Sequence, residues 1–122
     1  MILQDNLFTI ASSQKDEATA TYQVKINPEW PIYKAHFPGH PITPGVCIVQ
    51  MVQELLQDLV GAKLMLRQAK NVKYAAIISP EEVTDLTITF AKIEALPEGA
   101  YKVQAQVTSG EVLYTKLSAT FA

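Results

Sequence analysis

The chain has 122 residues, 48% of them hydrophobic and 18% charged, a composition that predicts one folded domain over residues 1–122 and excludes a disordered chain. The net charge of −2 gives no general electrostatic attraction to nucleic acid or to an anionic membrane surface. Cys47 is the single cysteine and there are two histidines, so an intramolecular disulfide and a multi-cysteine zinc site are excluded and a histidine-rich metal site is not expected.

The N-terminal part of the chain predicts two strands. Residues 7–10 form a short apolar run that favours an edge strand, and the polar residues 12–17 favour a turn. Over residues 18–26 apolar side chains alternate with other residues, which is typical of a half-buried strand. The N-terminus lacks the basic start and apolar core of a secretory signal, and no apolar run approaches the length of a membrane span. We therefore expect a soluble cytoplasmic protein.

Residues 27–45 differ from the rest of the chain in their proline content. Five of the seven prolines lie there, at positions 28, 31, 38, 41 and 44. This density argues against a helix or a central strand, so we predict an irregular segment. Each proline fixes its own φ angle and restricts the residue before it, so the segment should be rigid. A long, rigid loop in a compact domain is typical of a functional segment.

The pattern that follows predicts a helix over residues 45–60. Its polar side chains share one arc of the helix, and apolar side chains occupy the remainder. The polar arc consists of Gln50, Gln53, Glu54, Gln57 and Asp58. An apolar arc this wide indicates a helix that is mostly enclosed by other elements. Pro44 is placed to begin the helix and Gly61 to end it.

After Gly61 the hydrophobic period changes to two. We predict strands at about residues 63–78, 83–96, 101–108 and 112–121, with a two-residue hairpin turn at Ser109-Gly110. Long strands that follow one another in the chain favour an antiparallel meander. The predicted fold class is α+β, with one curved antiparallel sheet wrapped around one central helix.

Residues 36–46, HFPGHPITPGV, offer a base and an oxyanion site within ten residues. His36 is the candidate base, and the proline-rich loop leaves it little conformational freedom to lose when it engages a substrate. Gly45 lies at the predicted start of the helix, where backbone N–H groups lack partners within the helix. These donors and the helix dipole can stabilise the negative charge that develops on a thioester oxygen.

The sequence from His36 to Gly45 resembles the HFPGxPxxPG signature of the 3-hydroxyacyl-acyl carrier protein dehydratases of fatty acid synthesis. The resemblance implies the hot-dog fold and two active sites that form across a dimer interface. It implies that His36 handles the α-proton of the substrate and that the Gly45 amide binds the thioester carbonyl. The further substrate contacts that it implies are Phe37, Gly39, Pro44 and Val46.

The resemblance also implies the partners of the chain. The substrate is an acyl thioester delivered by acyl carrier protein, and its phosphopantetheine arm arrives with it, so no metal or other cofactor is expected. The chain is expected to form a homodimer or a higher hot-dog oligomer, or to pair with a second hot-dog subunit. Neither nucleic acid nor a membrane is expected as a partner.

Gln50 departs from the family pattern. The family has a glutamate or an aspartate five residues after the glycine that Gly45 matches, and here this position holds Gln50. A carboxylic acid can protonate the departing β-hydroxyl, whereas an amide can only donate a hydrogen bond. Either His36 performs both proton transfers, or Glu54, one helical turn beyond Gln50, assists through a water.

Three functional hypotheses stay open: a 3-hydroxyacyl thioester dehydratase, a thioester hydrolase in which Gln50 orients water, and a non-catalytic subunit that supplies half of a mixed site. The structural alternatives are a His36 that only stabilises its loop and a Gln50 that is one more residue of the polar arc. We interpret His40 as an exposed loop residue. Cys47 is interpreted as a small, buried apolar residue rather than a reactive thiol.

Overall fold

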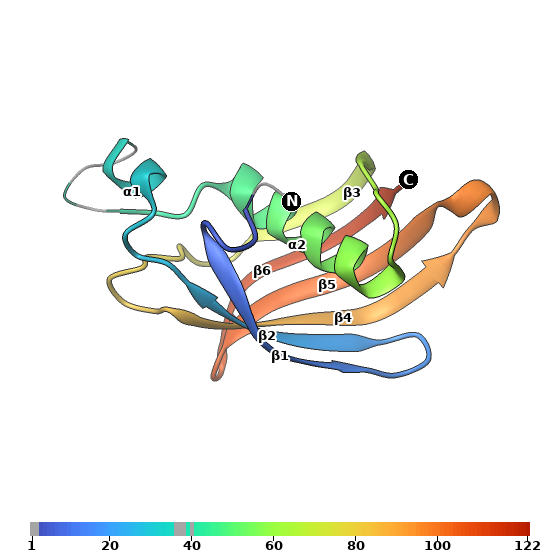
Figure 1. Cartoon of the computed structure of the whole chain (residues 1–122), viewed down its shortest axis with the longest axis horizontal. Helices are drawn as coiled ribbons and strands as arrows, with labels where there is room; N and C mark the ends of the chain where they lie inside the picture. The colour runs from blue at the N-terminus through green and yellow to red at the C-terminus, as the bar shows by residue number, and fades with distance from the viewer. Residues whose placement is uncertain (1–2, 36–38, 40) are drawn as a thin grey trace.

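The computed structural model describes residues 3–35, 39 and 41–122 of the chain. Its elements (Figure 1) are β1 (Phe8–Lys15), β2 (Ala20–Ile26), α1 (Pro31–Ala35), α2 (Gly45–Val60), β3 (Leu66–Tyr74), β4 (Asp85–Ala95), the short 3-10 helix η1 (Pro97–Gly99), β5 (Tyr101–Ser109) and β6 (Val112–Phe121). The bounds of α2 are those predicted for the helix. The predicted strands that follow are present, with ends displaced by a few residues.

The six strands form one antiparallel sheet in the order β1-β2-β4-β5-β6-β3. Strands β4, β5 and β6 are consecutive neighbours, as a meander requires. The predicted meander is wrong for β3, which pairs with β6 at the far edge of the sheet, while β2 lies beside β4. Local periodicity identifies strands but carries no information on which of them pair. The prediction from sequence therefore did not include the crossover that places β3 beside β6.

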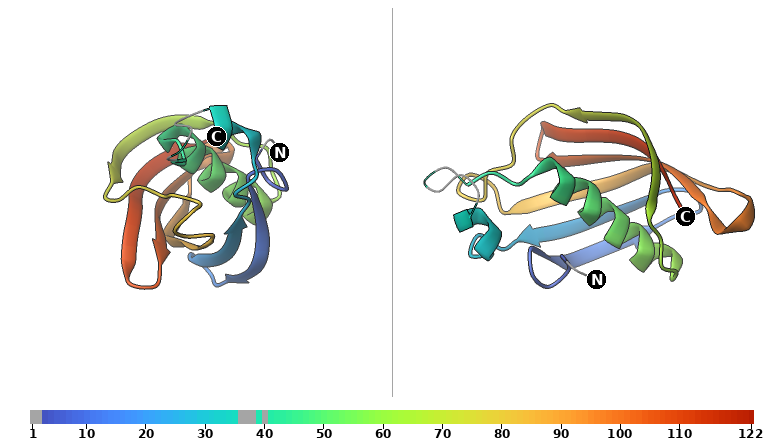
Figure 2. Two further views of the ribbon diagram at one scale, coloured as in Figure 1. Left: turned by 90° about the vertical axis from the view of Figure 1, so that its left-hand side faces the viewer. Right: turned by 90° about the horizontal axis from the view of Figure 1, so that it is seen from above.

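Helix α2 lies across the concave face of the sheet, which curves around it (Figure 2). The face of the helix that packs on the sheet contributes Ile48, Met51, Val52, Leu55 and Leu56 to the core. Strand β2 shows the predicted alternation, with every second residue buried. Gly61 ends the helix in the left-handed conformation at φ +69°, and its N–H donates to the carbonyl oxygen of Gln57. The predicted curved sheet around one central helix is confirmed.

Strand β1 corrects the prediction of a turn over residues 12–17. The strand continues to Lys15 and pairs with β2 along its whole length, with a bulge between Ile10 and Ser12. Its second half is polar because the strand lies at the edge of the sheet, where its side chains are exposed. Polar composition therefore indicated an exposed strand here and not a turn.

The proline-rich segment contains a short helix, contrary to the prediction of wholly irregular structure. Helix α1 begins at Pro31, and proline is tolerated in the first turn because the N–H that it lacks has no partner within a helix. The hairpin between β5 and β6 turns one residue later than predicted. Ser109 pairs with Val112, so the turn residues are Gly110 and Glu111, with Gly110 at φ +57°.

Strand β3 is an open edge of the sheet, and eight of its nine residues are exposed. Most of the large hydrophobic side chains that are exposed belong to this strand, to its flanking residues or to the first turn of α2. They are Val46, Met65, Leu66, Tyr74 and Ile77. Apolar side chains thus gather along one sheet edge and the adjoining helix start. Among the described residues, no helix combines the length and the apolar composition that crossing a membrane requires.

Candidate functional site

The first turn of α2 is shaped by Pro44 and Gly45. Pro44 occupies the N-cap position with extended backbone. Its side chain has no hydrogen-bond acceptor and therefore caps none of the N–H groups in the first turn. Gly45 meets the ring of Tyr74, the last residue of β3. A Cβ atom added at Gly45 would lie 2.7 Å from the Tyr74 ring carbon Cζ and 2.8 Å from its hydroxyl oxygen. A side chain at position 45 would therefore have to displace the exposed Tyr74 ring.

A buried pair of hydroxyl groups joins α1 to the chain just before α2. The Tyr33 hydroxyl lies 2.8 Å from Thr43 Oγ1, and both residues are 3% exposed. Burial raises the pKa of the Tyr33 hydroxyl. The Thr43 N–H also donates to the carbonyl oxygen of Ile78, which anchors the same stretch to the segment that follows β3. These contacts fix both ends of the segment that carries the sequence motif.

The motif itself is described in part. His36, Phe37 and His40 lie outside the described residues, so their predicted roles stay predictions. Gly39 is exposed and has φ +91°, a conformation that favours glycine. Val46 is 76% exposed on the first turn of α2, where it is free to meet another molecule.

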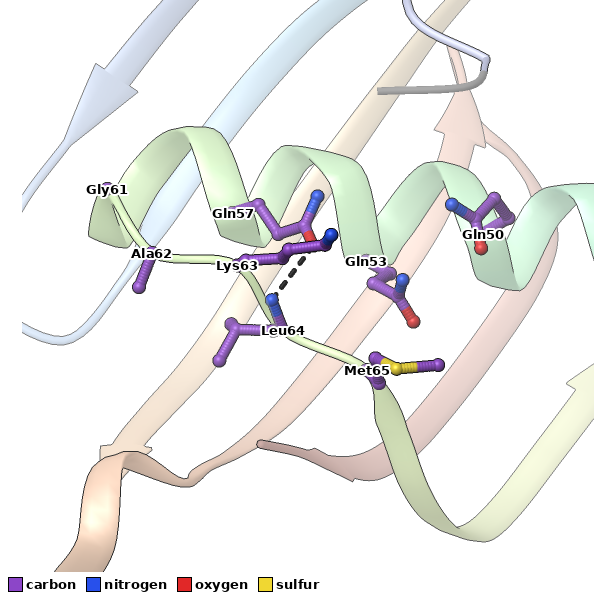
Figure 3. Close-up of a pocket in the computed structure, with 8 residues that line it drawn as sticks. All are labelled: Gln50, Gln53, Gln57, Gly61, Ala62, Lys63, Leu64 and Met65. Atoms are coloured by element: carbon purple, nitrogen blue, oxygen red, sulfur yellow. Dashed lines mark hydrogen bonds between the residues drawn. The ribbon is translucent and has the colours of Figure 1, made fainter.

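Gln50 lines a pocket of about 710 Å³ between α2 and the segment that leads from α2 to β3. The lining residues are Gln50, Gln53, Gln57, Gly61, Ala62, Lys63, Leu64 and Met65 (Figure 3). Two of the glutamines hold this segment in place: Gln57 Oε1 accepts from the Leu64 N–H at 2.9 Å, and Gln53 Oε1 accepts from the Leu66 N–H at 3.0 Å. Gln50 makes no such bond to this segment and donates instead to Glu54, which separates it from Gln53 and Gln57.

Glu54 departs furthest from the sequence analysis, because its side chain is fully buried. Its carboxylate accepts hydrogen bonds from the backbone N–H groups of Leu3 and Gln4 at 2.8–3.0 Å. Gln50 Nε2 donates to the remaining side of the carboxylate, with a distance of 3.0 Å to Glu54 Oε2. The carboxylate is engaged by the N-terminal segment and by Gln50, which argues against the assistance through a water that the sequence analysis considered for Glu54.

The polar arc thus has members with different tasks. Asp58 accepts a hydrogen bond from the Tyr22 hydroxyl at 2.9 Å, and burial together with this bond raises the pKa of Tyr22. Cys47 packs against the core, and burial raises the pKa of its thiol, in line with its interpretation as an apolar residue.

Of the predicted site residues, Gly45, Val46 and Gln50 lie on α2, and Pro44 is its N-cap residue. Gln50 follows Gly45 by five residues, which is about 7.5 Å along the helix axis. The sequence analysis missed the contact of Tyr74 with Gly45 and the burial of Glu54. The glycine at position 45 was the available signal for the first, and nothing in the local pattern signalled the second.

Comparison with known proteins places these features in a family. The model of the ApeI-like family, described as ApeI dehydratase, matches residues 12–111. The chain belongs to the ApeI-like dehydratase family. It is also 33% identical over 128 aligned positions to the 3-hydroxyacyl-acyl-carrier-protein dehydratase FabZ of Lactococcus lactis subsp. cremoris, covering 99% of this chain and 83% of that protein. The resemblance stated from the motif is thereby confirmed.

Other FabZ relatives match a shorter part of their sequences. The FabZ of Clostridium acetobutylicum is 29% identical over 94 positions, covering 71% of this ApeI-like chain. The FabZ of Wolbachia pipientis is 32% identical over 98 positions, covering 73% of the chain. In both cases the match spans 66% of the relative's own length.

Solved structures share the fold of this ApeI-like chain. One belongs to the dehydratase heterocomplex ApeI:P from Xenorhabdus doucetiae, with a TM-score of 0.71, 16% identity, and coverage of 93% of this chain and 96% of that one. Another is a mutant thioesterase from Pseudomonas aeruginosa, with a TM-score of 0.66, 11% identity, and coverage of 97% and 82%. Dehydratases and thioesterases therefore both occur on this fold.

Proposed function

We propose that the chain is a subunit of a dehydratase that acts on 3-hydroxyacyl thioesters carried by acyl carrier protein in the cytoplasm. The observation that carries this proposal is the arrangement on α2. Gly45 presents an uncapped helix start, and Gln50 faces a pocket from the position where the family resemblance implies an acid. The substrate brings its own phosphopantetheine arm, and the proposal needs no resident metal or other cofactor.

The proposed reaction begins at the α-carbon. His36 removes the α-proton, and the electron pair of that C–H bond forms the double bond between the α- and β-carbons. The bond from the β-carbon to its hydroxyl breaks, and the oxygen leaves as water after it gains a proton. The N–H groups at the start of α2, including that of Gly45, stabilise the charge on the thioester oxygen during the proton removal. Phe37, Gly39, Pro44 and Val46 are proposed to contact the substrate.

Gln50 cannot supply the proton that the departing oxygen needs. We therefore propose that the competent site is completed in a two-chain assembly joined along β3, because the exposed apolar side chains lie on this edge and beside it. In a homodimer His36 would recycle the proton that it removed from the α-carbon. In a complex with a second hot-dog chain that retains the acid, His36 of this chain would work with that acid. The ApeI:P heterocomplex supports the second arrangement as a precedent of assembly.

The test measures the absorbance of the enoyl thioester formed from a 3-hydroxyacyl-acyl carrier protein. This chain alone should be slow, and co-purification with an acid-bearing hot-dog subunit should raise the rate. His36→Ala in this chain should abolish the increase. If neither preparation forms the enoyl product, the dehydratase proposal is wrong. Release of free thiol by this chain alone would identify a hydrolase.

A further inference from the structure

Glu54 is a buried carboxylate that the proposed reaction does not use. It lies one helical turn beyond Gln50 and is fully enclosed by the N-terminal segment, α2 and the core. Both of its oxygens accept hydrogen bonds from backbone N–H groups. Leu3 N–H lies 3.0 Å from Oε1 and 2.9 Å from Oε2, and Gln4 N–H lies 2.8 Å from Oε1. Both oxygens thus act as acceptors toward the backbone.

This arrangement determines which way the Gln50 amide faces. A side-chain amide has one end that donates and one end that accepts. Because Glu54 Oε2 acts as an acceptor, the NH₂ group of Gln50 must be the end that faces it, at 3.0 Å. The carbonyl oxygen of Gln50 is then directed away from Glu54. In Figure 3 this oxygen is turned to the side of α2 on which Gln53 and Met65 line the pocket.

We propose that Glu54 is a positioning residue that presents the carbonyl oxygen of Gln50 to the pocket and thereby selects 3-hydroxyacyl over 3-oxoacyl thioesters. This inference rests on the proposed function and adds a basis for its substrate choice. A 3-hydroxyl group can donate a hydrogen bond to the Gln50 oxygen, whereas a 3-oxo group has only lone pairs to set against it. Leaving the Gln50 oxygen without a donor in the bound complex weakens the binding of the 3-oxo compound.

Glu54→Gln tests this inference with little change in side-chain shape. The new amide keeps one oxygen for the N–H groups of Leu3 and Gln4, so the N-terminal segment retains an acceptor. Its other end, in the place of Oε2, is a donor that faces the NH₂ of Gln50 and the Leu3 N–H, and two donors cannot bond. Leu3 keeps its bond to the oxygen in the place of Oε1. The Gln50 amide is expected to flip, so that its oxygen accepts from the amide at position 54 and its NH₂ faces the pocket.

Asp58→Asn is the matched control. It also replaces a carboxylate of α2 by an amide, but Asp58 is bonded to Tyr22 and lies two helical turns from Gln50. The control therefore removes the same charge from the same helix without changing a partner of Gln50. Circular dichroism should show that both variants keep the fold.

Two measurements compare the native chain, Glu54→Gln and Asp58→Asn. In a spectrum of ¹⁵N-labelled protein, assigned by comparison with Gln50→Leu, the side-chain NH₂ signals of Gln50 should move in Glu54→Gln and stay in place in Asp58→Asn. Calorimetry with two unreactive amide analogues, 3-hydroxyoctanoyl and 3-oxooctanoyl pantetheinamide, measures the selectivity. The native chain and Asp58→Asn should bind the hydroxy analogue about three- to tenfold more tightly, the range of one neutral hydrogen bond, and Glu54→Gln should lose or reverse this preference.

Each outcome bears on a different claim. Unmoved Gln50 signals in Glu54→Gln would overturn the positioning role. Equal binding of the two analogues by the native chain would overturn the selectivity while leaving the dehydratase proposal in place. If neither analogue binds and the absorbance assay shows no turnover, both the selectivity and the proposed function are overturned.

Discussion

Replacing Gln50 by glutamate places a second carboxyl group beside a buried one. The amide nitrogen of Gln50 lies 3.0 Å from Glu54 Oε2, so the new oxygen at position 50 would occupy the same short distance. Two negative charges 3 Å apart repel by about 5 kcal/mol at an effective dielectric constant of about 20. Water at the half-buried position 50 screens part of this repulsion. We take about half of this repulsion energy as remaining after screening, which corresponds to an increase of about two in the pH at which the pair loses its shared proton.

The pair is therefore expected to hold one shared proton near neutral pH. An ordinary glutamate titrates near pH 4.3, so this proton should be lost at about pH 6 to 7. A carboxyl group protonated in this range is the acid that the wild-type site lacks, and general acids contribute about 10²- to 10⁴-fold. Because the group is partly protonated at pH 7, we expect Gln50→Glu to dehydrate a 3-hydroxyacyl thioester at least about tenfold faster than wild type.

The assay is enoyl thioester absorbance between pH 5.5 and 8.5. The gain should be largest at low pH and fall as the pH rises through the titration of the pair. Gln53→Glu is the control, because it adds a charge to the same pocket beside Leu66 rather than beside Glu54, and it should give no gain. The double variant Gln50→Glu/Glu54→Gln should lose the gain near pH 7, because an amide at position 54 donates to the new carboxylate and favours its ionised form.

Stability gives an independent check on the same pair. Between about pH 4.3 and about pH 7 the folded Gln50→Glu protein binds more protons than its unfolded chain, so its stability relative to wild type should fall as the pH rises through this range. Differential scanning calorimetry at several pH values measures this trend. A variant no faster than wild type, with a flat pH profile and unchanged relative stability, would refute the reasoning. A carboxyl group at position 50 would then not share a proton with Glu54 and would not act as the missing acid.

The remaining predictions concern the motif, the helix start and assembly. His36→Ala should keep its fold by circular dichroism and lose about 10²- to 10⁴-fold in activity, and an equally active variant would confine His36 to a structural role. Gly45→Ala should displace the exposed Tyr74 ring and lower activity because its methyl group obstructs the helix start. Adding Tyr74→Ala should relieve the clash without restoring activity, whereas restored activity would show that packing alone was affected. Thr43→Val should cost about 1–3 kcal/mol in urea unfolding because the buried Tyr33 hydroxyl loses its partner, and Tyr33→Phe combined with it should cost less than the sum of the two single changes. Light scattering at micromolar concentration should show a dimer or a larger assembly, and a monomer would exclude a site shared between chains.

The parts of the fold that the sequence predicted well depend on local patterns. Helix α2 follows from its apolar arc and its flanking Pro44 and Gly61, and the strands follow from their period of two. The sheet order did not follow, because the pairing of β3 with β6 depends on contacts between distant parts of the chain. Strand β1 was shortened in the prediction because its polar outer half resembles a turn.

The site divides in the same way. Gly45 and Gln50 were recognised from the motif and its spacing, and the structure places them on one helix. The burial of Glu54 was not predictable, because its partner Leu3 is 51 residues away and offers only backbone N–H groups, which any residue has. The pairing of Tyr33 with Thr43 was likewise hidden, since the intervening motif contains no periodic pattern that relates the two.

The two edges of the sheet differ in a way that limits how copies can associate. The β1 edge is polar over its outer half, which discourages strand addition, whereas bulges occur at both edges, one in β1 and two in β3. The β3 edge has exposed apolar groups at Leu66 and Tyr74. A sheet that can be extended at one edge only forms a closed pair and not an open fibre. A chain whose β3 edge is left unpaired would, by the same reasoning, expose these apolar groups to water and be prone to aggregate.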